Sequence, residues 1–174
     1  MIAFGWAQAI VLLVAALRLG ELTLARANDR QLRAAGAVEY GAGHYPLFVL
    51  LHAGWLAAMF LVAPADAVPS PGWLALFVGA MALRLWAIGT LGQRWSTRVL
   101  VLAGAPLVKH GPYRWIRHPN YLAVAIELVA LGFALNVPLL GLVFGTLNLP
   151  LLAWRIRVEN EALRAASPGL HSAP

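Results

Sequence analysis

Five apolar stretches, separated by shorter polar segments, dominate the hydrophobic pattern of this 174-residue chain. Each approaches the ~20 residues that an α-helix needs to cross a hydrocarbon layer of ~30 Å, although the fourth is near the short limit. Residues 136–138 predict a tight turn, so the last two helices should form an antiparallel hairpin. The pattern therefore predicts an all-α integral membrane bundle of about five transmembrane helices, over residues 2–19, 45–63, 73–91, 119–135 and 138–156.

The composition agrees with a bilayer environment. Hydrophobic residues make up 61% of the chain and charged residues 11%, whereas a soluble domain has about 45–50% and about 25%. A single core of this size cannot bury so many apolar side chains, which favours lipid as the surrounding medium. The first stretch lacks the flanks of a signal peptide, so we expect it to remain as a helix. Without a repeat or a long linker, residues 1–174 are expected to form one domain.

The basic residues predict the orientation in the membrane. Of the 13 Lys and Arg residues, 11 lie in the segments 26–43 and 92–118 or from residue 155 onward, which alternate with loops that carry none. The positive-inside rule then places the N-terminus outside and the C-terminus in the cytoplasm. We therefore expect a multi-pass protein of the inner (cytoplasmic) membrane, with its active site facing the cytoplasm. Topology explains the net charge of +6, so no nucleic-acid partner is needed.

The segment 104–121 is polar, aromatic and rich in Gly and Pro, and it leads directly into the fourth apolar stretch. Irregular backbone beside a membrane is tolerated where protein covers it or where it lines a cavity. A rigid loop with Tyr, Trp, His and Arg at a helix N-terminus suits an anionic ligand. A basic cytoplasmic loop with an aromatic interface belt is the alternative interpretation of the same residues.

A second polar segment, Arg155 to Leu163, ends the fifth stretch. If the helix continues, Arg155 and Glu159 share one face, as do Arg157 and Glu161. Arg before Glu is the weaker order for a helical ion pair, so helix stability is a poor reason for the pattern. The alternative is a solvated helix end with ordinary charge pairs.

The ionisable residues His52, Arg84 and Glu127 fall well inside apolar stretches. Such groups are costly in lipid and usually face the bundle interior. Arg84 and Glu127 have matched depths, which favours a buried ion pair between them. The alternative is that Arg84 extends to the membrane surface and Glu127 is protonated.

Several kinds of chemistry are excluded or disfavoured. The chain has no cysteine, which rules out disulfides, thiol nucleophiles and Cys-ligated metals. No nucleotide, metalloprotease or serine-hydrolase motif occurs, and the irregular loop between His110 and His118 is not a metal-ligand spacing. No metal is therefore expected. Gly141 and Gly145 form a G-x-x-x-G pattern, which favours close helix packing within the chain over a dimer face.

At 111–121, Gly-Pro-Tyr-Arg-Trp-Ile-Arg-His-Pro-Asn-Tyr, the sequence resembles the isoprenylcysteine carboxyl methyltransferase family. Its Arg-His-Pro-x-Tyr element is that family's signature. The segment from Arg155 to Leu163 is similar to the family's second element, although Asn160 stands where the family has a second adjacent glutamate and Glu161 follows it. Residues 18–21, 25–30, 36–39 and 43–46 resemble small bacterial members associated with type III polyketide synthases, which methylate alkylpyrones or alkylresorcinols.

The resemblance implies a cytosol-facing pocket for S-adenosyl-L-methionine, which becomes S-adenosyl-L-homocysteine. The cofactor-binding part would span about 92–165, and a lipophilic substrate would enter it from the bilayer. Arg155 and Glu159 would be catalytic, with Arg155 facing the methyl acceptor. The residues implied to hold the cofactor are Leu107, Val108, Tyr113, His118, Pro119, Asn120, Tyr121 and Glu159. Arg98 stands where eukaryotic members carry a different polar residue, and its role stays open.

The implied reaction is an in-line methyl transfer, which needs alignment and a dry pocket but no metal. The acceptor would be a carboxylate, enol or phenol of an isoprenoid or alkyl polyketide. A carboxylate or an acidic enol arrives ionised, whereas a phenol with a pKa near ~10 would need a base such as His118 or Glu159. Two alternatives stay open: a membrane reductase of related fold that uses NADPH, and a non-enzymatic scaffold or transport component. The oligomeric state is not predicted.

Overall fold

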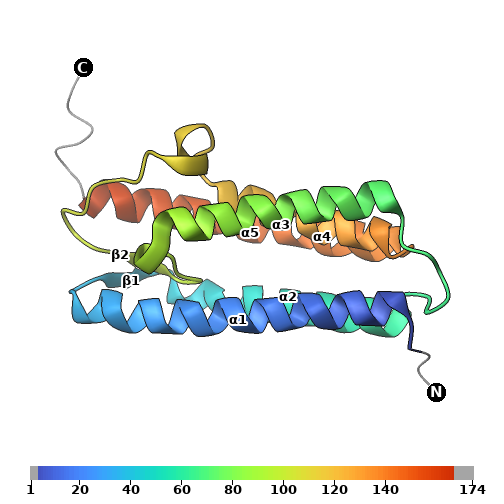
Figure 1. The fold of residues 1–174 in the computed structure, drawn as a ribbon. Helices are drawn as coiled ribbons and strands as arrows, with labels where there is room; N and C mark the ends of the chain where they lie inside the picture. Colours follow the sequence, from blue (N-terminus) through green and yellow to red (C-terminus); the bar gives the residue numbers. More distant parts are fainter. Residues whose placement is uncertain (1–3, 167–174) are drawn as a thin grey trace.

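The computed structural model describes residues 4–166 and confirms the all-α membrane bundle. Figure 1 shows consecutive helices running in opposite directions, with α1 beginning and α5 ending at opposite ends of the bundle. The five α-helices of the described chain are α1 (Trp6–Ala34), α2 (Tyr45–Val62), α3 (Pro71–Leu91), α4 (Pro119–Ala134) and α5 (Pro138–Ala166).

Short elements gather at the end of the bundle where α1 and α3 finish. They include two strands that pair antiparallel, with Val38 opposite Val101 and Tyr40 opposite Val99. The all-α prediction did not anticipate this small sheet, because it joins segments about 60 residues apart. These elements are β1 (Val38–Tyr40), η1 (Ala42–His44), η2 (Gly92–Arg94), β2 (Val99–Val101) and η3 (Gly111–Arg114).

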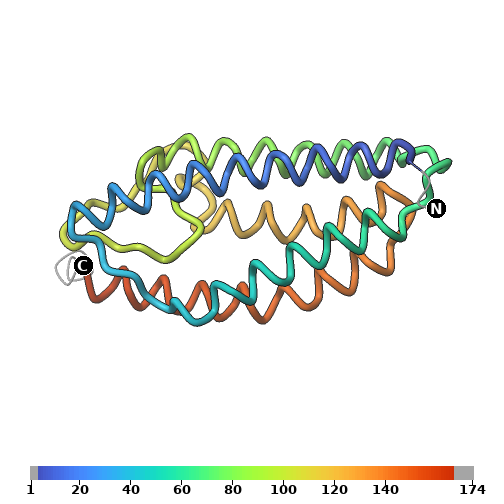
Figure 2. Tube along the Cα trace, turned by 90° about the horizontal axis from the view of Figure 1, so that it is seen from below, coloured from blue at the N-terminus to red at the C-terminus, as the bar shows by residue number. Residues whose placement is uncertain are grey.

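Four helical segments are long and apolar enough to cross a membrane: Trp6–Ala34, Ala42–Val62, Pro71–Arg94 and Pro138–Ala166. The α4 helix has 16 residues and is therefore only about 24 Å long, in line with the expectation that the fourth stretch is near the short limit. It compensates by lying inside the bundle, where it packs against both α3 and α5 (Figure 2).

The prediction that residues 26–43 form a loop is wrong for its first part, because α1 continues to Ala34. The reason is a second buried face beyond the apolar stretch. Ala25, Asn28, Asp29 and Leu32 are all buried, and their spacing of three and four residues places them on one side of the helix. The predicted continuation of α5 past Ile156 is confirmed, since the helix reaches Ala166.

The G-x-x-x-G pattern packs within the chain, as favoured. A Cβ on Gly141 would lie 2.8 Å from the carbonyl oxygen of Val129, and a Cβ on Gly145 would lie 2.6 Å from a methyl carbon of the same residue. The glycines therefore let α5 approach the backbone of α4 closely. Asn136 adopts a positive φ of 61° in the turn between the two helices, which supports the predicted hairpin.

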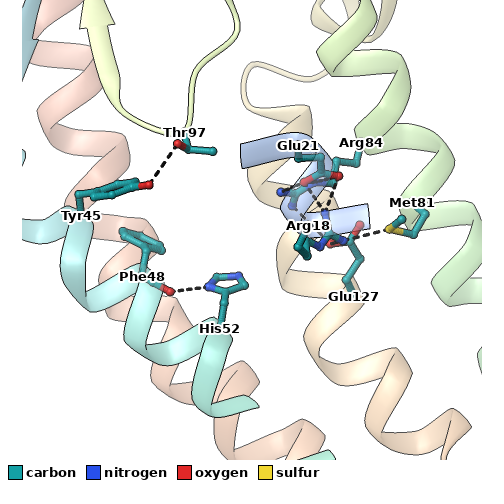
Figure 3. Close-up of polar contacts among 9 residues, drawn as sticks. All are labelled: Arg18, Glu21, Tyr45, Phe48, His52, Met81, Arg84, Thr97 and Glu127. Carbon is teal, nitrogen blue, oxygen red and sulfur yellow. Dashed lines mark hydrogen bonds and ion pairs between the residues drawn. The ribbon is translucent and has the colours of Figure 1, made fainter. Parts of the chain in front are cut away.

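A four-residue ion cluster joins α1, α3 and α4 in the middle of the bundle (Figure 3). The expected pair is present, with Arg84 Nη1 3.4 Å from Glu127 Oε2. Glu21 accepts a hydrogen bond of 2.7 Å from Arg84 Nη2, and Arg18 Nη2 lies 2.9 Å from Glu127 Oε2. Because Arg84 is only 8% exposed, the alternative that it extends to the membrane surface is wrong.

Arg18 and Glu21, the two cluster residues on α1, were not predicted from the sequence. The cluster has two guanidinium and two carboxylate groups, so their formal charges cancel. The Nδ1–H of His52 on α2 donates a hydrogen bond of 2.8 Å to the Phe48 carbonyl oxygen, and the ring points toward the interior that the cluster occupies (Figure 3). Intramembrane charges thus face the bundle interior, as their cost in lipid requires.

Candidate active site

A pocket with a volume of about 100 Å³ lies beside the end of α3, at the start of α4 and against the last part of α5. The residues that line it are Leu91, Arg94, Trp95, Ser96, Arg98, Val99, Leu100, Val101, Tyr113, His118, Pro119, Asn120, Tyr121, Arg155, Glu159 and Leu163.

Arg155, Tyr121 and Glu159 form a hydrogen-bonded network in this pocket. The Tyr121 hydroxyl accepts a bond of 2.9 Å from Arg155 Nε and donates one to the Glu159 carboxylate. Arg155 Nη2 also donates a bond of 2.7 Å to the carbonyl oxygen of Thr97. Arg155 and Glu159, on one face of α5, are therefore connected by hydrogen bonds through Tyr121 of α4, and not by an ion pair within the helix.

Arg155 is 6% exposed, so the alternative of a solvated helix end is wrong for this residue. Its guanidinium carbon lies 5.3 Å from the ring centre of Phe48 and 5.6 Å from that of Tyr121. Aromatic faces at this distance stabilise a cation. The two aromatic rings therefore stabilise the positive charge of Arg155 in the pocket wall.

The start of α4 presents the rest of the 118–121 element to the pocket. Pro119 occupies the first helical turn and is buried, where its missing N–H costs nothing. The rings of His118 and Tyr121 stack with their centroids 5.4 Å apart. This arrangement turns both rings toward one pocket, as the resemblance implied.

Two buried polar atoms in the pocket wall have no hydrogen-bond partner among the described residues: Trp95 Nε1 and Asn120 Oδ1. One is a donor and the other an acceptor. Buried polar atoms are rarely left unpaired, so each is free to bind a ligand. Together with the Glu159 carboxylate and the aromatic rings, these atoms fit a cofactor that carries a cation and polar adenosine groups.

Tyr113, on η3, also lines the pocket. Burial raises the pKa of its phenol well above the usual value, and the negative charge of Glu159 raises it further. Tyr113 therefore stays protonated at neutral pH and can donate a hydrogen bond, but it does not serve as a base.

Leu107 and Val108, which the resemblance implied as cofactor contacts, are not among the residues that line this pocket. They lie in the loop between β2 and η3, where both are half-buried. Arg94 Nη2 donates a bond of 2.7 Å to the carbonyl oxygen of Pro106, which holds this loop against η2 at the exposed edge. Asn160 and Glu161 are also absent from the pocket lining, and Glu161 is exposed.

Residues 94–101 form a wall of the pocket, within the expected cofactor-binding range of 92–165, but none of them was assigned to the cofactor from the sequence. Arg98 in this wall is 2.6 Å from Glu39 Oε1 and lies 4.2 Å above the ring of Tyr45. The hydrogen bond that Arg98 donates to Glu39 raises the pKa of the Arg98 guanidinium. Arg98 itself was noted as a position of open role, but its partners come from distant segments that no local pattern connects to it.

Comparison with known proteins agrees with the motifs. A sequence model of the isoprenylcysteine carboxyl methyltransferase (ICMT) family matches residues 73–165. The uncharacterized protein YpbQ of Bacillus subtilis is 34% identical over 166 residues, which cover 93% of this chain and 98% of that protein. An uncharacterized protein of Haemophilus influenzae is 26% identical over 160 residues, covering 89% of this chain and 93% of the relative.

The matched range contains most of α3, all of α4, most of α5 and every pocket-lining residue. It also contains both motifs that carried the resemblance, at 111–121 and 155–163. The chain therefore belongs to the isoprenylcysteine carboxyl methyltransferase family.

Proposed function

We propose that the protein is an S-adenosylmethionine-dependent methyltransferase that O-methylates a lipid-like acceptor at the membrane. Family membership indicates a membrane methyltransferase, and methyltransferases of this family generally use S-adenosylmethionine. The observation that carries the proposal is the Arg155–Tyr121–Glu159 network in the wall of a pocket that Trp95 and Asn120, two residues with unpaired polar atoms, also line.

The chain's residues divide between the two reaction partners. When bound, S-adenosylmethionine supplies a methyl group on a cationic sulfonium. The Glu159 carboxylate and the rings of Tyr113 and Tyr121 favour a positive charge in the pocket. Trp95 Nε1 and Asn120 Oδ1 offer the donor and the acceptor that polar cofactor groups need.

Arg155 would hold the acceptor oxygen. Its guanidinium is fixed on two sides, by Tyr121 and by the Thr97 carbonyl oxygen. A preorganised cation of this kind stabilises the negative charge on an attacking oxygen without a cost of reorganisation. An acceptor carboxylate or acidic enol needs no base here, whereas a phenol would lose its proton to His118 or Glu159, which both line the pocket.

The acceptor would reach the pocket from the bilayer. A mostly apolar groove lies between α1 and α3 and is lined in part by Leu17, Leu24, Leu85 and Ile88. Ile88 stands one helical turn from Leu91, which lines the pocket described above. The groove thus adjoins the pocket along α3 and offers a place for the alkyl part of a lipophilic acceptor.

One experiment tests the proposal. Purified protein in detergent is incubated with methyl-labelled S-adenosylmethionine and a lipid extract of its host, and the product is identified by mass spectrometry. We expect a lipophilic O-methyl product and measurable binding of S-adenosylhomocysteine. Binding of NADPH without S-adenosylhomocysteine would instead support a reductase, and binding of neither in detergent or lipid would support a non-enzymatic role.

A further inference from the structure

Asn28 and Asp29 are neighbouring polar residues of α1. Both are buried, and both are far from the pocket motifs along the sequence. Asn28 is 4% exposed and Asp29 is 9% exposed. Both lie before residue 73, outside the range that the family model matches. Buried polar groups are costly unless they are hydrogen-bonded, so their partners indicate what they do.

Asn28 is bonded to the backbone of the pocket wall. Its Nδ2 donates one bond of 3.1 Å to the carbonyl oxygen of Gly92 and one of 2.8 Å to that of Trp95. Trp95 is buried against Ala25 of α1. It lines the pocket, and its buried Nε1 has no partner among the described residues. Asn28 therefore fixes the backbone that carries this indole.

Asp29 is bonded to the next part of the same wall. Its Oδ1 accepts a hydrogen bond from the Ser96 hydroxyl, which in turn accepts a bond of 2.8 Å from the backbone N–H of Arg98. Asp29 Oδ2 also lies 3.7 Å from Arg98 Nε. Between Ser96 and Arg98 is Thr97, whose carbonyl oxygen accepts the bond from Arg155. Asp29 thus holds the turn that fixes the buried guanidinium.

We infer that Asn28 and Asp29 are positioning residues of the active site, which set the wall formed by residues 92–98. The inference rests on the proposed function. The pocket motifs of the family range are then incomplete without α1, because two residues that line the pocket, Trp95 and Arg155, depend on carbonyl oxygens and a turn that α1 holds. Neither positioning residue lines the pocket itself.

The test measures the affinity for S-adenosylhomocysteine by calorimetry in full-length variants, with melting temperatures recorded in parallel. We expect Asn28→Ala and Asp29→Ala to weaken binding about tenfold, which corresponds to one lost hydrogen-bonded positioning contact. Asp29→Asn keeps an oxygen that accepts the Ser96 hydroxyl, so we expect it to recover most of the affinity. Gln31→Ala, an exposed position one turn along α1, should bind like the wild type.

Wild-type affinity in folded Asn28→Ala and Asp29→Ala proteins would overturn the inference. A loss of affinity in Asp29→Asn equal to that in Asp29→Ala, or any loss in Gln31→Ala, would also overturn it, because the effect would not follow the hydrogen bonds. If Asn28→Ala does not fold, the comparison of the two Asp29 variants decides. Failure of the wild-type protein to bind would instead refute the proposed function, and the positioning role with it.

Discussion

Tyr121 connects the two charged residues of the candidate site. Its hydroxyl accepts a hydrogen bond from Arg155 and donates one to Glu159. The spacing of four residues between Arg155 and Glu159 predicts that they share one helix face. It does not predict Tyr121 between them, because that contact joins two helices. The 117–121 motif placed Tyr121 in the site only through resemblance to a family.

Replacing Arg155 with Ala should reduce methyl transfer far more than cofactor binding. The side chain is held toward the acceptor by Tyr121 and the Thr97 carbonyl oxygen, and loss of one such preorganised group costs about 10²–10³ in rate. Single-turnover rates and the affinity for S-adenosylhomocysteine are measured together, with Arg157→Ala, an exposed position on α5, as the control. Equal losses of rate and affinity would place Arg155 in the cofactor site instead.

The stability of the β1–β2 end should depend on pH through Glu39. Burial raises the pKa of this carboxyl, but hydrogen bonds from Arg33 and Arg98 and the charges of these arginines outweigh it and hold the pKa below 4.5. A lowered pKa in the folded state stabilises the protein above the unfolded value and loses that effect as the pH falls through the folded value. The melting temperature of Glu39→Gln should therefore lie below that of the wild type at pH 7.

On acidification toward pH 3, the two melting temperatures should converge, because a protonated Glu39 resembles the Gln side chain. Thermal melts at a series of pH values measure this difference. A gap that stays constant between pH 7 and pH 3 would mean that the charge of Glu39 does not contribute.

Among the helices, the apolar stretches were sufficient to find all five described α-helices but not their polar ends. The continuation of α1 to Ala34 depends on Asn28 and Asp29, which pack against a loop more than 60 residues away. The sheet pairing of Val38 with Val101 is equally non-local. Depth matching did identify the Arg84–Glu127 pair, because rise per residue fixes depth within a helix, but depth alone did not include α1.

The ion cluster should couple α1 to α3 and α4. Glu127→Gln removes one of two carboxylates and leaves two buried guanidinium groups undercompensated, and breaking a buried pair in this way costs about 3–5 kcal/mol. We expect a clearly lower melting temperature in detergent, whereas Asp66→Asn, at an exposed loop position, should leave it unchanged. An unaltered melting temperature and activity in Glu127→Gln would argue against a buried pair.

The α4–α5 hairpin should be sensitive to a single methyl group. Gly141→Ala would place a Cβ 2.8 Å from the Val129 carbonyl oxygen, so the helices must separate and their packing weakens. Gly79→Ala is the matched control, because a Cβ there meets nothing within 4 Å. Thermal melts should show a loss for Gly141→Ala alone; similar melts for both variants would mean that the close approach does not stabilise the hairpin.

At the scale of the whole molecule, the family motifs define one end of the bundle, and the segment before residue 73 supports it. Glu39, Tyr45 and Asp29 all contact Arg98 in the pocket wall. Motif recognition placed most of the pocket residues, since the motifs are local in sequence. It could not place the wall at 94–101, which is held by side chains from α1, β1 and α2.

The distribution of basic residues predicts how the whole molecule is oriented in the membrane. The chain has no cysteine, so single cysteines can be introduced as Asp66→Cys and Lys109→Cys, at exposed positions near opposite ends of the bundle. In right-side-out vesicles, an impermeant maleimide should label the variant at 66 and should reach the variant at 109 only after permeabilisation. The reverse labelling would invert the orientation and place the pocket outside the cell.

We propose that one pocket, formed by residues 94–101, 113–121 and 155–163, binds the methyl donor. Ultraviolet cross-linking of radiolabelled S-adenosylmethionine to the purified protein, followed by peptide mapping, tests it most directly. We expect the radiolabel in peptides from these three segments. S-adenosylhomocysteine should suppress the labelling, and NADPH should leave it unaffected. Label confined to other segments, or suppressed by NADPH alone, would contradict it.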